Sequence, residues 1–189
     1  MRVRMMLFAP YAAAAVLATT LSACTPAQAP EGGAGGAAAP AQQAQVHGNL
    51  AQVMRGILYP ASNVIFFAQS VDPTTVKTEG DASTSPNPLS SSYGGWEAVS
   101  NAGIALAESA NLLIIPGRMC MNGKPAPIQN ADWQMWVQEL RNAGMTSYKA
   151  GQAKNMDAVL GAADVMSTAC QNCHDKYREV AGGIPDRCM

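Results

Sequence analysis

The sequence predicts an all-α domain of four helices, and three observations lead to this class. Apolar residues recur at spacings of three and four residues in four stretches between residues 47 and 180, which is the period of amphipathic helices. Glycine and proline mark the ends of these stretches. The stretches fall within residues 47–189, and these roughly 143 residues have the size of one domain.

Residues 1–23 have the features of a lipoprotein signal peptide. A positive start is followed by an apolar run from Met5 to Leu21, and the run ends in Leu21-Ser22-Ala23-Cys24, which resembles the lipobox of bacterial lipoproteins. We therefore expect cleavage before Cys24 and lipidation of that cysteine, which anchors the chain in a membrane of the cell envelope. An ordinary signal peptide and an uncleaved signal anchor are the alternatives. Thr25, in place of Asp, permits sorting to the outer membrane in diderm bacteria.

Residues 24–46 are predicted to form a flexible tether that faces the periplasm. They are mostly Ala, Pro, Gly and Gln with one charge, Glu31, and this composition buries too little surface to fold. A coil of about 20 residues spans roughly 25 Å. Removing Arg2 and Arg4 from the 12 basic residues leaves 10 against 13 acidic ones. This mildly acidic balance gives no indication of nucleic acid binding.

The first predicted helix carries an apolar stripe from His47 to Ala68, with a kink or break after Gly56 because Pro60 lies inside it. Residues 71–93 contain several Pro, Gly and Ser residues and are predicted to form a long polar loop. The second helix is predicted over residues 96–115, where Pro116-Gly117 ends it.

The third helix is predicted from an Asp132 cap, through Trp133 and Tyr148, to an end at Gly151. The fourth runs from about Ala153 to Val180 and is stopped by Gly182-Gly183.

The last predicted helix contains Cys170-Gln171-Asn172-Cys173-His174, the Cys-x-x-Cys-His pattern of c-type haem attachment. The two thiols add to the two vinyl groups of the porphyrin, so they must lie one helical turn apart on one face. His174 then becomes the proximal iron ligand. A redox dithiol or a metal knuckle is the alternative, although no βαβ pattern surrounds the motif. We expect one covalent haem c, bound through Cys170 and Cys173.

The chain resembles the cytochrome c′ family in two respects. It has four predicted helices with this motif near the end of the last one, and the motif is followed by Asp175-Lys176-Tyr177-Arg178. The helix order covers residues 47–182, whereas the specific match is confined to residues 170–179. The resemblance implies an antiparallel up-down-up-down four-helix bundle with the haem near the end of its last helix. The long loop at 71–93, the two cysteines Cys120 and Cys188, the lipobox and the tether depart from the family.

In that topology Met54 and His174 lie at the same level, each about 10 Å from the shared end of the bundle. The resemblance puts the residue at the place of Met54 on the distal side of the haem, which makes Met54 the candidate sixth iron ligand. The alternative is a methionine that only packs in the core. His47, two turns earlier, is a rival ligand, and a solvent-facing histidine is the simpler account of it.

Further residues near this end are candidate parts of the haem site. Trp133 and Trp136 are expected to wall it together with Leu112, Leu113 and Met135, although Trp at helical spacing is more often core. Arg55 and Arg178 are candidates for pairing with the haem propionates, with solvated surface charge as the alternative. Tyr177 follows His174 by three residues and is expected to pack close to it.

Cys120 and Cys188 remain after lipid and haem have taken the other three cysteines. In an oxidising compartment, two leftover thiols in one small domain usually form a disulfide. The second and fourth helices both end just before these residues, at the same end of the bundle. The alternative is a free Cys188 near the terminus, or one that links two molecules into a homodimer.

Electron transfer is the predicted function: a membrane-tethered c-type cytochrome that exchanges single electrons with redox partner proteins. With only two histidines and no nucleophile, base and orienting group, we expect no enzyme. A saturated iron with Met54 as sixth ligand favours electron transfer. An open, five-coordinate iron in an apolar pocket would instead bind nitric oxide or carbon monoxide. A structural lipoprotein of the envelope is a third, weaker hypothesis.

Overall fold

The computed structural model describes residues 44–77, 79–81, 83 and 85–188, and within them the protein is all-α. These residues form four helical segments, and their one β-type pairing is an isolated bridge between Met119 and Pro125. The predicted all-α class with four helices is thus confirmed. The predicted signal peptide, Cys24 and the tether up to residue 43 lie outside the described residues. No described helix is both long and apolar enough to cross a membrane.

The first helical segment comprises α1 (Leu50–Val53), η1 (Met54–Leu58) and α2 (Tyr59–Ala68). A capping box starts it: the Asn49 side chain accepts a hydrogen bond from the Gln52 amide at 3.0 Å, and the Gln52 side chain accepts one from the Asn49 amide at 2.8 Å. The start predicted at His47 is therefore wrong. His47 is exposed and precedes the cap.

The sequence predicts a kink or a break after Gly56; the structure has no break there, but the helix is irregular at this place, over Met54–Leu58. Proline has no amide hydrogen, and its ring would collide with the carbonyl of the residue four positions earlier, here Gly56. The helix accommodates Pro60 by widening into a π-turn over η1. In this turn the Tyr59 amide donates a hydrogen bond to the Met54 carbonyl, five residues earlier. The segment therefore continues to Ala68, and Met54 opens its widened turn.

The loop predicted at 71–93 is present: the described residues from 69 to 95 contain no helix. α3 (Trp96–Ser109) follows and tightens into the 3-10 turn η2 (Ala110–Leu113), close to the predicted range. α4 (Ala131–Ala153) and α5 (Met156–Tyr177) complete the fold. The α4 helix passes Gly151 and ends at Ala153; its C-cap residue, Lys154, adopts a left-handed conformation (φ 51°). Asn155 caps α5 by accepting from the Ala158 amide at 3.0 Å.

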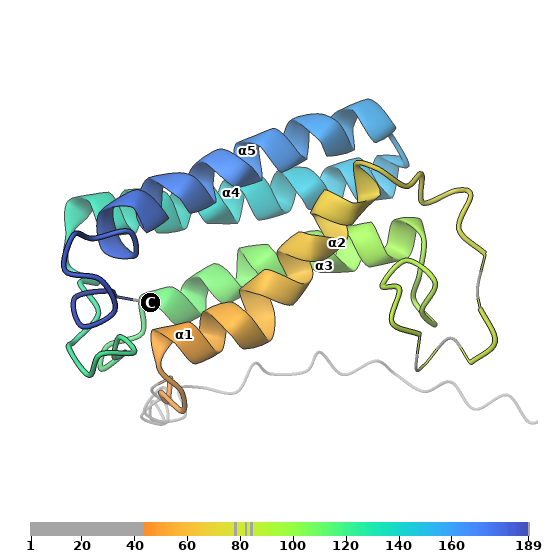
Figure 1. Ribbon diagram of the computed structural model, residues 1–189. Coiled ribbons are helices and arrows are strands. Elements are labelled where there is room, and N and C mark those ends of the chain that lie inside the picture. The colour runs from red at the N-terminus through yellow and green to blue at the C-terminus, as the bar shows by residue number, and fades with distance from the viewer. Residues whose placement is uncertain (1–43, 78, 82, 84, 189) are drawn as a thin grey trace, which may run out of the picture. The chain divides into compact units, whose positions relative to one another are not determined.

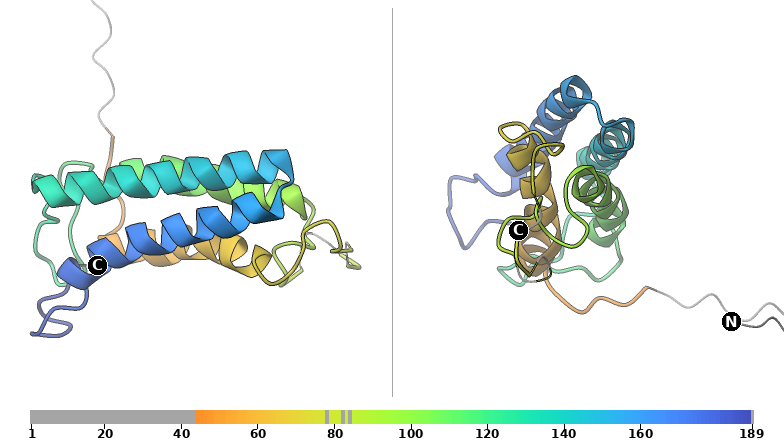
Figure 2. Two further views of the ribbon diagram at one scale, coloured as in Figure 1. Left: turned by 90° about the horizontal axis from the view of Figure 1, so that it is seen from above. Right: turned by 90° about the vertical axis from the view of Figure 1, so that its right-hand side faces the viewer.

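Figure 1 shows each helical segment running back along the one before it, and the end-on view in Figure 2 shows α5 beside both α4 and the first segment. The pair α3 and α4 is packed most closely. A Cβ at Gly103 would lie 2.4 Å from the Tyr148 backbone nitrogen, and one at Gly144 would lie 2.6 Å from the Ala107 nitrogen. Only glycine permits this backbone approach. Fully buried side chains from all four segments form the core: Leu50, Ile65, Val99, Leu106, Trp133, Val159 and Met166.

Candidate functional site

A cavity of about 270 Å³ lies between the first helical segment and α5, with α3 and α4 forming its remaining walls. This volume is near the lower end of the roughly 300–1,000 Å³ typical of pockets for small molecules. Side chains from all four helical segments line it. They are Met54, Arg55, Leu58, Tyr59, Ser62, Leu106, Leu113, Trp133, Trp136, Val137, Leu140, Ala169, Cys170, Cys173, His174 and Arg178.

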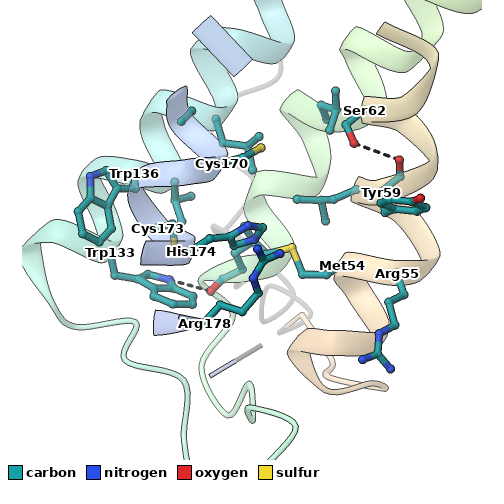
Figure 3. A pocket seen from close by; sticks show the side chains of 16 residues that line it. Met54, Arg55, Tyr59, Ser62, Trp133, Trp136, Cys170, Cys173, His174 and Arg178 are labelled. Carbon is teal, nitrogen blue, oxygen red and sulfur yellow. Dashed lines mark hydrogen bonds between the residues drawn. The ribbon is translucent and has the colours of Figure 1, made fainter. Parts of the chain in front are cut away.

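The Cys-x-x-Cys-His residues form the α5 wall of this cavity (Figure 3). Cys170 and Cys173 are one helical turn apart, both thiols are free, and both are half-buried. His174 follows them in the last turn of α5. The structure therefore brings the three motif side chains to one cavity, as the sequence predicts.

Burial sets the protonation of these groups. It raises the pKa of Cys173 to about 12, helped by the neighbouring Cys170 and Asp132, and it raises the pKa of Cys170 as well. Redox dithiols need the opposite shift, toward a reactive thiolate, so the burial of these two thiols disfavours that alternative. Burial, and then the charge of Arg178, lower the pKa of His174. Its imidazole is therefore neutral at pH 7 and keeps the lone pair that a metal ligand needs.

Met54 forms the wall opposite the motif. It is half-buried at the start of the π-turn, and Figure 3 shows its thioether reaching from the first segment toward His174 and Arg178. Leu58, four residues later and buried, lines the same wall. The sequence prediction that Met54 and His174 lie at one level agrees with their place in a single cavity.

An aromatic cluster closes one end of the cavity. Trp133 is 1% exposed, and its indole nitrogen donates to the Leu113 carbonyl at 3.2 Å. Tyr177 does not line the cavity but packs behind it, with its ring edge-on to Trp133 (centroids 5.0 Å apart) and to Trp136 (5.9 Å). Tyr177 thus contacts the wall of the cavity, from the same helix as His174.

Asp132 supports this cluster. The sequence analysis expected Asp132 to cap α4, and this expectation is wrong. The N-cap position belongs to Asn130, and Asp132 is the second helical residue. Its carboxylate accepts a hydrogen bond from the Tyr177 hydroxyl at 2.8 Å and forms an ion pair with Lys176. These two donors lower the pKa of Asp132, with Lys176 the larger cause.

The two arginines that are candidates for pairing with haem propionates differ in their orientation relative to the cavity. Arg178 lines the cavity, points inward beside His174 in Figure 3, and forms an ion pair with Glu179. Arg55 lies at the rim, and its guanidinium turns away from the cavity, where Nη2 is 3.9 Å from the Met121 sulfur.

Several predicted residues lie outside the cavity. His47 is exposed, Met135 is 51% exposed, and Leu112 is partly buried against the core without lining the site. Other lining residues were not singled out from the sequence: Leu58, Tyr59, Ser62, Leu106, Val137, Leu140 and Ala169. Helical spacing was the available signal, because Leu58 follows Met54 by four residues and Leu140 follows Trp136 by four.

A disulfide joins Cys120 and Cys188, the pair expected from the sequence. Their Cα atoms are 4.7 Å apart, within the range of about 4.4–6.8 Å that disulfides require. The bond fastens the C-terminal tail to the connection between α3 and α4.

The donor set fits a covalently attached haem better than a bare metal ion. No three His, Cys, Asp or Glu side chains among the described residues converge as a metal site would require. A c-type haem uses one neutral histidine, two free thiols one turn apart, a thioether opposite and a mostly apolar lining, and the cavity has each of these.

Comparison of the chain with protein-family models, with curated proteins and with solved structures finds no match. The resemblance to cytochrome c′ therefore depends on the chain's own residues, above all on the motif at 170–174 and the order of its helices.

Proposed function

We propose that this chain is a lipid-anchored c-type cytochrome that transfers single electrons in the bacterial cell envelope. Its fold would be the antiparallel up-down-up-down four-helix bundle of the cytochrome c′ type. One observation carries the proposal: the two thiols and the histidine of Cys170–His174 line a single apolar cavity that has Met54 on its opposite wall.

The chain's residues have distinct roles in this proposal. A haem, when bound, supplies one-electron redox chemistry at its iron. Cys170 and Cys173 hold it through thioether bonds, and His174 offers a neutral ring nitrogen to the iron. Trp133 and Leu113 keep water from one edge of the site. Arg178 holds a positive charge at the cavity, where it would balance a propionate.

Met54 favours electron transfer over ligand binding. If a haem is bound, the Met54 thioether would be available as a further iron ligand; such a ligand would favour one-electron exchange and would raise the potential. The partners would be redox proteins of the periplasm, reached from a membrane anchor at Cys24. No catalytic residues are assigned.

Binding of nitric oxide or carbon monoxide is the second candidate function. The observation that favours it is the apolar lining around Met54, which includes Leu58, Leu106 and Leu113. Such walls suit small neutral molecules, which need few polar contacts. In this case Met54 would only pack in the cavity, and a bound haem would have a free position for the gas.

Covalent attachment is the first test. The chain is expressed with a haem-attachment system, denatured, and measured by mass and by the pyridine haemochrome spectrum. Wild-type protein is expected to carry one haem through two thioether bonds, and Cys170→Ser or Cys173→Ser through one. If denatured wild-type protein carries no covalent haem, the proposed function is wrong.

The optical spectrum with and without carbon monoxide separates the two functions. Electron transfer predicts a low-spin spectrum that carbon monoxide leaves unchanged, and Met54→Leu should convert it to a high-spin form that binds the gas. Met145→Leu is the matched control, because Met145 is also half-buried but lies outside the cavity. A wild-type iron that binds carbon monoxide readily would favour the second function.

A further inference from the structure

The connection between α3 and α4 forms a closed loop that bonds to two other parts of the chain. We call residues 118–126 the clasp. Its two arms are joined by backbone hydrogen bonds, from the Cys120 amide to the Lys124 carbonyl at 2.8 Å and from the Ala126 amide to the Arg118 carbonyl at 2.9 Å. The clasp is therefore a defined structural unit and not a loose connection.

On one side the clasp holds the start of the first helical segment. The Met119 carbonyl accepts a hydrogen bond from the Leu50 amide at 2.8 Å. Arg118 is 4% exposed; its Nε donates to the Leu112 carbonyl at 3.0 Å and its Nη1 to the Gly48 carbonyl. A buried guanidinium thus ties η2 to the residues just before α1.

On the other side the clasp holds the tail that follows α5. The disulfide joins Cys120 to Cys188, and the Asn122 side chain donates to the Pro185 carbonyl at 3.0 Å. Lys124 also pairs with Asp186 at 3.1 Å. The tail returns to α5 itself, where the Cys188 amide donates to the Tyr177 carbonyl at 2.8 Å.

These bonds lie at the end of the molecule where the two walls of the cavity face each other. Met54 is four residues after Leu50, and His174 is three residues before Tyr177. Between them lies the cavity, so the two helices have little direct packing at this level, and α5 meets the first segment mainly along α2. The clasp provides the connection that side-chain packing does not.

We propose that the clasp is the positioning element that holds Met54 opposite His174, anchored by Arg118 on the Met54 side and by the disulfide on the His174 side. The mechanical part of this proposal, that the clasp holds the two walls of the cavity in position, depends only on the contacts above. Its effect on the iron rests on the proposed function. Releasing either anchor lets the first segment move away from α5. The sixth ligand position then opens, while α3 and α4 keep their own packing.

Hydrogen–deuterium exchange on the purified full-length chain tests the mechanical part, whatever its haem content. The variants are Arg118→Gln and the double variant Cys120→Ser with Cys188→Ser. Arg141→Gln is the matched control, because Arg141 of α4 is half-buried and donates to Asn111 at 2.9 Å but lies outside the clasp. Peptides covering residues 50–68 are expected to exchange about tenfold faster or more in both clasp variants, the scale of losing a hydrogen bond to a charged group. Peptides from the centres of α3 and α4 should keep the wild-type rate.

The optical spectrum tests the effect on the iron in the haem-loaded protein. Each clasp variant should gain a fraction of a high-spin form that binds carbon monoxide, and neither should alter the spectrum further when Met54 is already Leu. Unchanged exchange at 50–68, or equal acceleration in all helices, would overturn the clasp as a positioning element. If the wild type with attached haem is low-spin, unchanged spectra in the clasp variants would also overturn it.

The two failures are distinguishable. If no haem is attached in the wild type, the proposed function fails, and the exchange rates alone then decide the proposal for the clasp. If Arg118→Gln does not fold, the double serine variant, which removes no buried charge, provides the same measurement.

Discussion

Replacing Gly144 with alanine should loosen the α3–α4 interface, although alanine is the better helix former. The added Cβ would lie 2.6 Å from the Ala107 backbone nitrogen and 2.8 Å from the Gly103 carbonyl oxygen. Backbone atoms cannot turn aside as a side chain does, so the two helices must separate by about 1 Å to restore ordinary contact distances of roughly 3.5–4 Å.

The size of the effect follows from two opposing contributions. Overpacking a well-packed interface typically costs about 1–3 kcal/mol, and more where backbone is the obstacle. Gly→Ala in a helix interior gains about 1 kcal/mol. We therefore expect Gly144→Ala to lower the free energy of unfolding by up to about 2 kcal/mol.

Gly161→Ala is the matched control, because a Cβ there meets nothing within 4 Å in the middle of α5. This variant should be more stable than wild type by about 1 kcal/mol, the helix propensity gain alone. Urea denaturation followed by circular dichroism measures both variants. A Gly144→Ala protein as stable as the Gly161→Ala protein would refute the close approach of α3 and α4.

Three further predictions concern other parts of the chain. Replacing Cys120 and Cys188 with serine opens a loop with a sequence separation of 68 residues, and urea denaturation should show a loss of up to about 4 kcal/mol in the entropic model. Asp132 has a pKa lowered by Lys176, so its contribution to stability is present above the unfolded carboxyl pKa of about 3.9 and is lost as the pH falls through the lower folded value. Asp132→Asn should therefore flatten the fall in melting temperature on acidification, and an unchanged profile would exclude this pairing. Cys24→Ala should release the protein from membranes or block its processing, as cell fractionation and mass measurement would show; unacylated wild-type protein in the periplasm would contradict the anchor.

Much of the fold could be predicted from the sequence because the helical stretches carry strong local signals. The spacing of apolar residues identified all four segments, and Pro116-Gly117 ended the second one near the right place. The long loop at 71–93 was also predictable from its Pro, Gly and Ser content. The site was predictable for a similar reason, since Cys170, Cys173 and His174 are adjacent in sequence and one helical turn fixes their geometry.

The errors came from competition between local and tertiary interactions. Asp132 is a good capping residue, but Tyr177 and Lys176 recruit its carboxylate, and Asn130 takes the cap position. Pro60 is a strong helix breaker, yet a π-turn accommodates it within a segment that the core holds on both sides. Neither the contacts of the Asp132 carboxylate nor the π-turn before Pro60 can be predicted from the few neighbouring residues in the sequence.

The disulfide also has a consequence for how the chain would mature in an oxidising compartment. Four cysteines of the folded domain, Cys120, Cys170, Cys173 and Cys188, can pair in three ways. Cys170 and Cys173 are neighbours on one helix, whereas Cys120 and Cys188 meet only after the clasp and the tail have docked. An oxidant acting on the nascent chain would therefore close the local pair first. In the proposed cytochrome, haem attachment at Cys170 and Cys173 would remove that competitor permanently, so the order of the two covalent modifications would decide how much of the chain reaches its native pairing.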